Sequence, residues 1–108
     1  MFEDLYDAVS LMWSFAWPTA QGEITTVDVE RIPHSEGGDT LRLAIAYKFS
    51  LGEDGPYTGE SFWTSKFLNK KRVIEARHHF HINQPVTVRY RRDDPSVNTL
   101  DRTMWRDL

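Results

Sequence analysis

The stretch from Leu41 to Trp63 constrains the fold more than any other part of the sequence. In its first half an apolar side chain stands at every second position, namely Leu41, Leu43, Ile45, Tyr47 and Phe49. Successive side chains of an extended chain point to opposite faces, so this pattern predicts a strand with one buried face and one solvated face.

The same stretch predicts that this strand turns back on itself. Two glycines and a proline occur between Gly52 and Pro56, where glycine accepts positive φ and proline fixes its own φ. Residues 57–64 are rich in aromatic and hydroxyl side chains, which is typical of a returning strand. An isolated hairpin is marginal in water, so the rest of the chain must cover its apolar face.

Three more segments are predicted to be strands. The segment Ala20–Ile32 changes the parity of its apolar residues around Thr25 and Thr26, which predicts a β-bulge there. In Pro85–Arg91, apolar and polar residues alternate, and Val97–Leu100 is short enough to be a final strand. Together with the hairpin, these segments make five strands.

Two helices are predicted. Residues 1–16 carry apolar side chains at three- and four-residue intervals, and Pro18 disfavours helical geometry in the residue before it. The apolar stripe could pack on the sheet, join two protomers or lie on a membrane, although its acidic residues argue against the last. The second helix is predicted to begin after Asn69 as N-cap and to end near His81, with its inner face at Val73, Ala76, Arg77 and Phe80.

The fold class that follows is a β-rich α+β domain, with residues 1–108 forming one unit. Residues 1–16 are the helical segment, 17–100 the β-rich core and 101–108 a tail expected to be partly ordered, by Trp105 alone. The expected architecture is a small antiparallel barrel or a strongly bent sheet, with one helix between the third and fourth strands. The predicted strands are Ala20–Ile32, Thr40–Ser50, Pro56–Ser65, Pro85–Arg91 and Val97–Leu100, and the predicted shared core is Leu43, Ile45, Tyr47, Phe80, Val86 and Val88.

Composition narrows the class of protein. The chain has no cysteine, no run near the roughly 20 apolar residues of a membrane span, and an acidic N-terminus unlike that of a signal peptide. We therefore expect a soluble, cytoplasmic protein. The net charge of −3 conceals an acidic first half and a basic second half. Such halves either attract each other within the fold or give a basic surface for an acidic partner.

No pattern indicates catalysis or a bound cofactor. The sequence has no glycine-rich phosphate loop, nucleophile elbow or zinc-protease helix motif, and the adjacent carboxylates Asp93 and Asp94 suit a turn better than an acid–base pair. His78, His79 and His81 invite a metal interpretation. A closed site needs about four ligands, so surface histidines at a helix C-terminus are the expected alternative. We predict no enzyme, no cofactor and no small-molecule substrate.

Three segments resemble the bacterial family called Domain of Unknown Function 3592. A Trp-Pro pair precedes the first strand, at Trp17 and Pro18. A tyrosine strand, a turn and a Tyr-x-Gly motif follow, and a Val-x-Val-x-Tyr strand leads to a turn ending in Pro-Ser. The segments are residues 17–30, 41–62 and 84–100. The resemblance implies a β-rich fold but no catalytic residues. Members often carry membrane helices, for which this sequence has no matching segment.

The function predicted from these observations is protein interaction or self-association, including a homodimer. The chain has four tryptophans, a residue enriched at interface hot spots, and the predicted surface comprises Leu5, Val9, Trp13, Trp63, Arg91 and Arg92. The alternative is a barrel that binds single-stranded nucleic acid or another anion. It would use Lys66, Lys70, Lys71, Arg89, Arg91 and Arg92 for phosphates and Trp63 or Tyr90 for stacking. Because the protein is acidic overall, we expect no nucleic-acid binding.

Overall fold

A computed structural model describes residues 16–65, 69–106 and 108. The elements in chain order are β1 (Thr19–Pro33), β2 (Asp39–Leu51), β3 (Asp54–Trp63), α2 (Lys70–Arg77), β4 (Pro85–Arg91), β5 (Asp94–Leu100) and a 3-10 helix, η3 (Arg102–Trp105). All pairings are antiparallel, in the spatial order β3-β2-β1-β4-β5. Five strands with a helix between the third and fourth were predicted, and this is confirmed.

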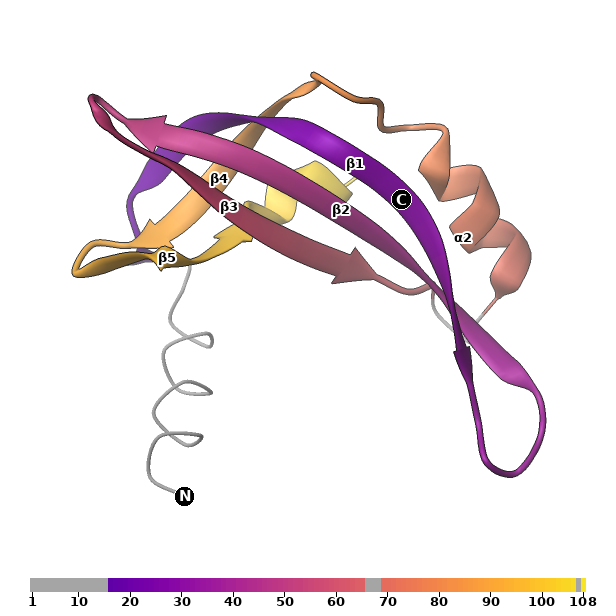
Figure 1. Cartoon of the computed structure of the whole chain (residues 1–108). Coiled ribbons are helices and arrows are strands. Elements are labelled where there is room, and N and C mark those ends of the chain that lie inside the picture. The colour runs from indigo at the N-terminus through magenta and orange to yellow at the C-terminus, as the bar shows by residue number, and fades with distance from the viewer. Residues whose placement is uncertain (1–15, 66–68, 107) are drawn as a thin grey trace.

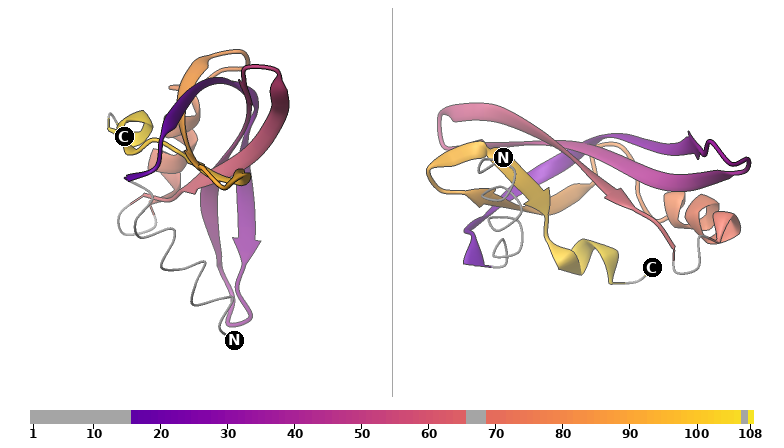
Figure 2. Two further views of the ribbon diagram at one scale, coloured as in Figure 1. Left: turned by 90° about the vertical axis from the view of Figure 1, so that its left-hand side faces the viewer. Right: turned by 90° about the horizontal axis from the view of Figure 1, so that it is seen from below.

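The sheet is strongly curved, so its two edge strands, β3 and β5, come close together (Figures 1 and 2). No backbone ladder joins β3 to β5, and the sheet therefore stays open. Of the two predicted architectures, the bent sheet is correct and the closed barrel is wrong.

Side-chain hydrogen bonds connect the two edge strands, which no backbone ladder joins. The Tyr47 hydroxyl donates a hydrogen bond of 2.7 Å to Asn98 Oδ1, and the Leu100 amide donates one of 3.2 Å to Ser61 Oγ. Asn98 Nδ2 also donates to the Thr58 carbonyl at 3.2 Å. We call this group of five residues the seam. The side chains of Asn98 and Ser61 satisfy one backbone group on each edge strand, the Thr58 carbonyl of β3 and the Leu100 amide of β5.

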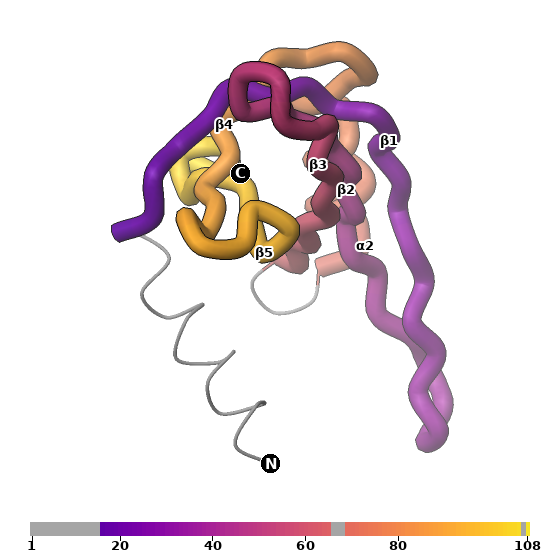
Figure 3. The backbone as a smooth tube through the Cα atoms, turned by 60° about the vertical axis from the view of Figure 1, so that its left-hand side comes forward, coloured from indigo at the N-terminus to yellow at the C-terminus, as the bar shows by residue number. Residues whose placement is uncertain are grey.

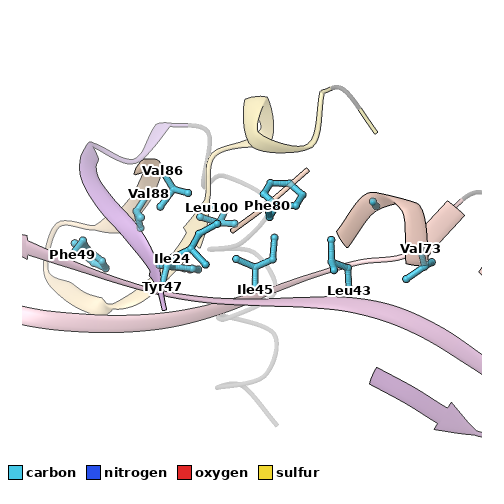
Figure 4. Packing of buried hydrophobic residues seen from close by; sticks show 11 residues of the cluster. Ile24, Leu43, Ile45, Tyr47, Phe49, Val73, Phe80, Val86, Val88 and Leu100 are labelled. Atoms are coloured by element: carbon cyan, nitrogen blue, oxygen red, sulfur yellow. The ribbon is translucent and has the colours of Figure 1, made fainter. Parts of the chain in front are cut away.

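The hydrophobic core lies inside the curve of the sheet (Figure 4). Tyr47 is fully buried, and its burial raises the pKa of the hydroxyl, an effect partly offset by the hydrogen bond with Ser61. The hydroxyl is therefore protonated and able to donate at neutral pH. All six residues predicted to share one core do so, and the cluster also includes Ile24, Phe49, Val73, Ala76 and Leu100.

The helix α2 is shorter than predicted. Asn69 caps it, as expected, by accepting hydrogen bonds from the amides of Lys71 and Arg72. The helix ends at Arg77 rather than near His81, because the His78 amide bonds back to Glu75 in a tighter turn. The predicted helix over residues 1–16 lies outside the described residues, apart from Ala16, so α2 is the one α-helix in the described part of the chain.

The register of β1 against β2 shifts between Ile24 and Thr26, which confirms the predicted bulge.

The strand boundaries differ from prediction at two turns. β3 begins at Asp54 and β5 at Asp94, both earlier than predicted. The reason is the same in both places: two-residue connections leave the flanking residues paired across the ladder, Leu51 with Asp54 and Arg91 with Asp94.

The C-terminal tail packs through more residues than Trp105 alone, which corrects the prediction. Trp105 meets the Phe80 ring edge-on at 5.7 Å, and Met104 and Leu108 also contact the core. Asp101 begins η3 by accepting hydrogen bonds from the amide and hydroxyl of Thr103, at 2.9 and 2.7 Å.

β1 and β2 extend together past the curved part of the sheet (Figure 3). We call residues 26–46 the arm: it contains β1 after the bulge, the loop 34–38 and the first part of β2. α2 packs against both strands, and Lys70 of α2 and Arg31 of β1 both form ion pairs with Asp39. The hydrogen bond from Lys70 lowers the pKa of Asp39. The arm is thus held against α2 at its far end.

Candidate functional site

The predicted interaction surface does not form one patch. Leu5, Val9 and Trp13 lie outside the described residues. Trp63, at the end of β3, is half-buried and packs on the core, whereas Arg91 and Arg92 lie at the β4–β5 turn. These two places are at opposite ends of the molecule (Figure 1). The structure therefore does not bring together the described members of the predicted surface.

Three of the basic residues that the nucleic-acid alternative requires, Arg89, Arg91 and Lys70, are engaged with other groups, whereas Lys71 and Arg92 are exposed. Arg89 forms an ion pair with Asp101 at 2.7 Å and donates to the Trp17 carbonyl, and Arg91 is bonded through two nitrogens to Asp93. The hydrogen bonds from Arg91 lower the pKa of Asp93. Burial would raise the pKa of Asp101, but hydrogen bonds from Thr103 and the charge of Arg89 outweigh it, and the net shift is downward.

The stacking residues of that alternative are also engaged. Tyr90 is half-buried and stacks on Phe49 with 5.9 Å between ring centroids. Lys70 is paired with Asp39, and Lys66 lies outside the described residues. No arrangement among the described residues specifically favours a groove for single strands, and the absence of nucleic-acid binding stays a prediction.

The histidines are exposed and do not share a helix face. His78 is the C-cap of α2, and His79 and His81 follow in the turn after it. His78 and His81 would be neighbours on a helix that continued to His81, as predicted, but α2 ends at Arg77. Within the described ranges, no group of three or more histidine and acidic residues is arranged to hold a metal ion.

Two open depressions among the described residues have volumes of about 510 Å³ each. One lies where β1 and β2 bend, with the ion pair between Glu23 and Lys48 at its wall. The other lies between Val27 and the segment that follows α2, and includes the exposed Ile82. Among the described residues, no hydrogen bond joins a nucleophile to a base at either depression, although Ser50, Glu23 and Lys48 all line the first.

A long unpaired strand edge is the feature that remains. β1 has 15 residues, but only Thr19–Glu23 pair with β4, whereas residues up to Pro33 pair with β2. The last contacts on the β4 side are the Ile24 amide to the Gln84 carbonyl, 3.0 Å, and the Asn83 amide to the Ile24 carbonyl, 2.8 Å. Asn83 has φ of 70° and turns the chain away from β1 at that point.

We call residues Thr26–Pro33, on the side of β1 away from β2, the free edge. In the described part of the chain no other strand pairs with it. In an antiparallel ladder alternate residues direct their amide and carbonyl groups to each side, so the free edge presents unpaired backbone donors and acceptors. Val27 and Val29 face the core side, while Thr26 and Asp28 are exposed on the opposite, outer face.

Sequence reasoning did not identify the free edge. It recognised β1 as a strand and placed the bulge, but alternation of side chains does not show which backbone edge finds a partner. The only available signal was the difference in length between the predicted strands Ala20–Ile32 and Pro85–Arg91.

These observations define a β-rich domain with one open, curved sheet, and none of its described helices is long and apolar enough to cross a membrane. The chain belongs to the family described as Domain of unknown function (DUF3592), whose profile matches residues 20–105. The predicted family resemblance is thereby confirmed. No curated protein and no solved structure matches the chain.

Proposed function

We propose that this protein is a non-catalytic interaction domain that binds another protein by adding a strand of that partner to the free edge. Strand addition is a common mode of recognition, in which main-chain hydrogen bonds supply affinity and alternate side chains supply specificity. The observation that carries the proposal is a run of eight strand residues with a ladder on one side only.

The surroundings of the free edge support this role. The arm extends past the curved part of the sheet, so a partner strand alongside it would not have to displace β4 (Figure 3). The ion pair of Lys70 with Asp39 links the arm to α2, and the ion pair of Arg31 with Asp39 joins the two strands of the arm before binding. A preorganised edge loses less conformational freedom when a partner binds.

The proposal also concerns the compartment of the protein and the absence of catalysis. We place the protein in the cytoplasm, because a sequence without cysteine suits a reducing compartment. We also propose that it catalyses no reaction, since the side chains at the two large depressions do not form a nucleophile–base arrangement.

Site-specific photo-crosslinking in the cells that produce the protein tests the proposal. A benzophenone side chain in place of Thr26 stands at the free edge, and one in place of Glu53 stands at the β2–β3 turn as the matched control. Both positions are exposed, so neither replacement disturbs the core. We expect a discrete protein adduct from position 26 alone. Equal adducts from both positions, or none from position 26, would contradict the proposal.

A further inference from the structure

The charges along the free edge indicate what kind of strand it accepts. We propose, building on the proposed function, that the partner strand is basic: it carries lysine or arginine on the face that continues the outer face of β1, and it is not a second copy of this chain. The residues that carry this inference are Asp28 and Glu30.

Asp28 is a carboxylate that forms no ion pair with any described residue. It is exposed on the outer face, and its cross-strand neighbour in β2 is Ala44, beyond which lies Phe62 of β3. On the free side, the position directly opposite Asp28 would belong to the incoming strand. Opposite charges in that position attract, and like charges repel.

The neighbouring acid is only partly neutralised. Glu30 accepts a hydrogen bond of 3.2 Å from Arg42, and the same guanidinium lies 3.9 Å from the centre of the Phe62 ring. Glu60 of β3 is exposed on the same outer face, in the row that continues through Ala46 to Thr26. This part of the outer face therefore has three carboxylates, those of Asp28, Glu30 and Glu60, and one arginine, Arg42. The outer face beside the free edge is acidic.

A second copy does not fit this edge. When two copies of β1 pair antiparallel, directly opposite residues must have their side chains on the same side of the combined sheet. A shift of one residue would place core-facing side chains beside solvent-facing ones. A two-fold axis at Asp28 sets Asp28 opposite itself, and one at Glu30 sets Glu30 opposite itself. An axis at Val29 sets Asp28 opposite Glu30 twice.

The fourth central register, with the two-fold axis at Arg31, also places like charges opposite each other. An axis at Arg31 sets two arginines opposite each other on the core-facing side, where Arg31 already pairs with Asp39 of its own chain. Every register centred from Asp28 to Arg31 therefore opposes like charges. Charged edges of this kind are a known way to prevent sheets of identical chains from joining. A strand with basic side chains on the outer face meets no such repulsion.

The test uses two synthetic probes and one charge reversal. The basic probe is a fluorescent peptide of alternating valine and lysine flanked by threonine, and the acidic probe replaces each lysine with glutamate. The full chain is compared with D28K and with the matched control E53K, which makes the same change in net charge at an exposed turn. Binding is measured by fluorescence anisotropy at physiological salt.

We expect the basic probe to bind the wild-type chain and E53K equally. We expect about tenfold weaker binding to D28K, because an attractive pair becomes a repulsive one. The acidic probe should bind D28K better than it binds the wild-type chain. Equal weakening by D28K and E53K would overturn the inference, because it would show attraction to the overall charge and not to the edge. Preference of the wild-type chain for the acidic probe would also overturn it.

Failure of this inference is distinguishable from failure of the proposed function. If position 26 yields a crosslinked partner but neither probe binds, or if the adduct is a second copy of the chain, the edge is an interaction site and the basic strand is wrong. If position 26 yields no adduct and neither probe binds, both proposals are wrong, and the charges only protect the edge.

Discussion

The seam and the free edge are two ways of treating the edge of one sheet. At the seam, edge strands β3 and β5 come together, and side chains of Tyr47, Ser61 and Asn98 bond to each other and to backbone groups. Along the free edge, β1 has a backbone partner on one side only, and charged residues stand on its outer face.

The difference teaches which part of the sheet serves stability and which part is available for binding. Backbone groups at the seam are satisfied within the chain, so closing the seam stabilises the fold and leaves little there for a partner. No strand in the described part of the chain pairs with the free edge, so side-chain changes there should scarcely alter stability. Substitutions in the two regions should therefore have opposite consequences for folding and for binding.

The largest loss of stability is expected from Gly59→Ala. A Cβ at this position would collide with Asn98 Oδ1 and lie 2.5 Å from the Tyr47 hydroxyl oxygen, so the seam would have to open. We expect a loss of about 3 kcal/mol in the free energy of unfolding, measured by urea denaturation. The control is Gly37→Ala, where φ is +94° but no atom lies within 4 Å; it should cost about 1 kcal/mol. Equal losses would show that no close contact exists at Gly59.

A smaller loss is expected from Asn98→Ala. This change removes the acceptor of the Tyr47 hydroxyl and the donor to the Thr58 carbonyl, and leaves a largely buried hydroxyl with a weak contact to Ser61 at 3.5 Å. We expect about 2 kcal/mol in thermal or urea unfolding. Tyr47→Phe should cost less, since it removes the hydroxyl itself and leaves no buried hydroxyl without a strong partner. A double variant that loses the sum of both single effects would contradict the bond between them.

Asp101→Asn should destabilise the chain by about 1 kcal/mol at neutral pH, because Asp101 loses its charge beside Arg89. The pKa of Asp101 is lower in the folded chain than the ordinary value of 3.8. Its ionised form therefore stabilises the fold above the unfolded-state pKa, and this contribution is lost as pH falls through the folded-state pKa. Unfolding measured from pH 7 to about pH 2 should show the difference between wild type and variant shrink. A difference that stays constant would rule out the ion pair as its cause.

The smallest effect on stability is expected from Asp28→Lys at the free edge. Asp28 is exposed and opposite Ala44, so the free energy of unfolding should change by no more than about 0.5 kcal/mol. Urea denaturation of the variant beside Glu53→Lys checks this. A loss comparable to that of Asn98→Ala would mean that Asp28 is part of the fold, and the comparison between the two edges would fail.

Much of the fold could be predicted because local periodicity reports burial. Alternation placed Leu43, Ile45 and Tyr47 in the core, and the change of parity after Ile24 located the bulge. The N-cap at Asn69 was predictable because a short polar side chain can accept from the next amides. These features depend on residues close together in the chain.

The seam and the free edge could not be predicted because both depend on which distant segments pair. Tyr47 and Asn98 are 51 positions apart, and no periodicity records that their side chains meet. The free edge follows from where Asn83 turns away from β1, which strand patterns do not show. Trp63 was assigned to a surface because tryptophan is common at interfaces, but in this chain it packs on the core.

The central claim is that the free edge is unpaired while the seam is closed, and amide hydrogen exchange by NMR tests it directly. We expect alternate amides from Val27 to Ile32 to exchange rapidly at every protein concentration, because they face away from β2. The Leu100 amide, bonded to Ser61 Oγ at the seam, should exchange slowly. Uniform protection along β1, or rapid exchange at Leu100, would contradict the account.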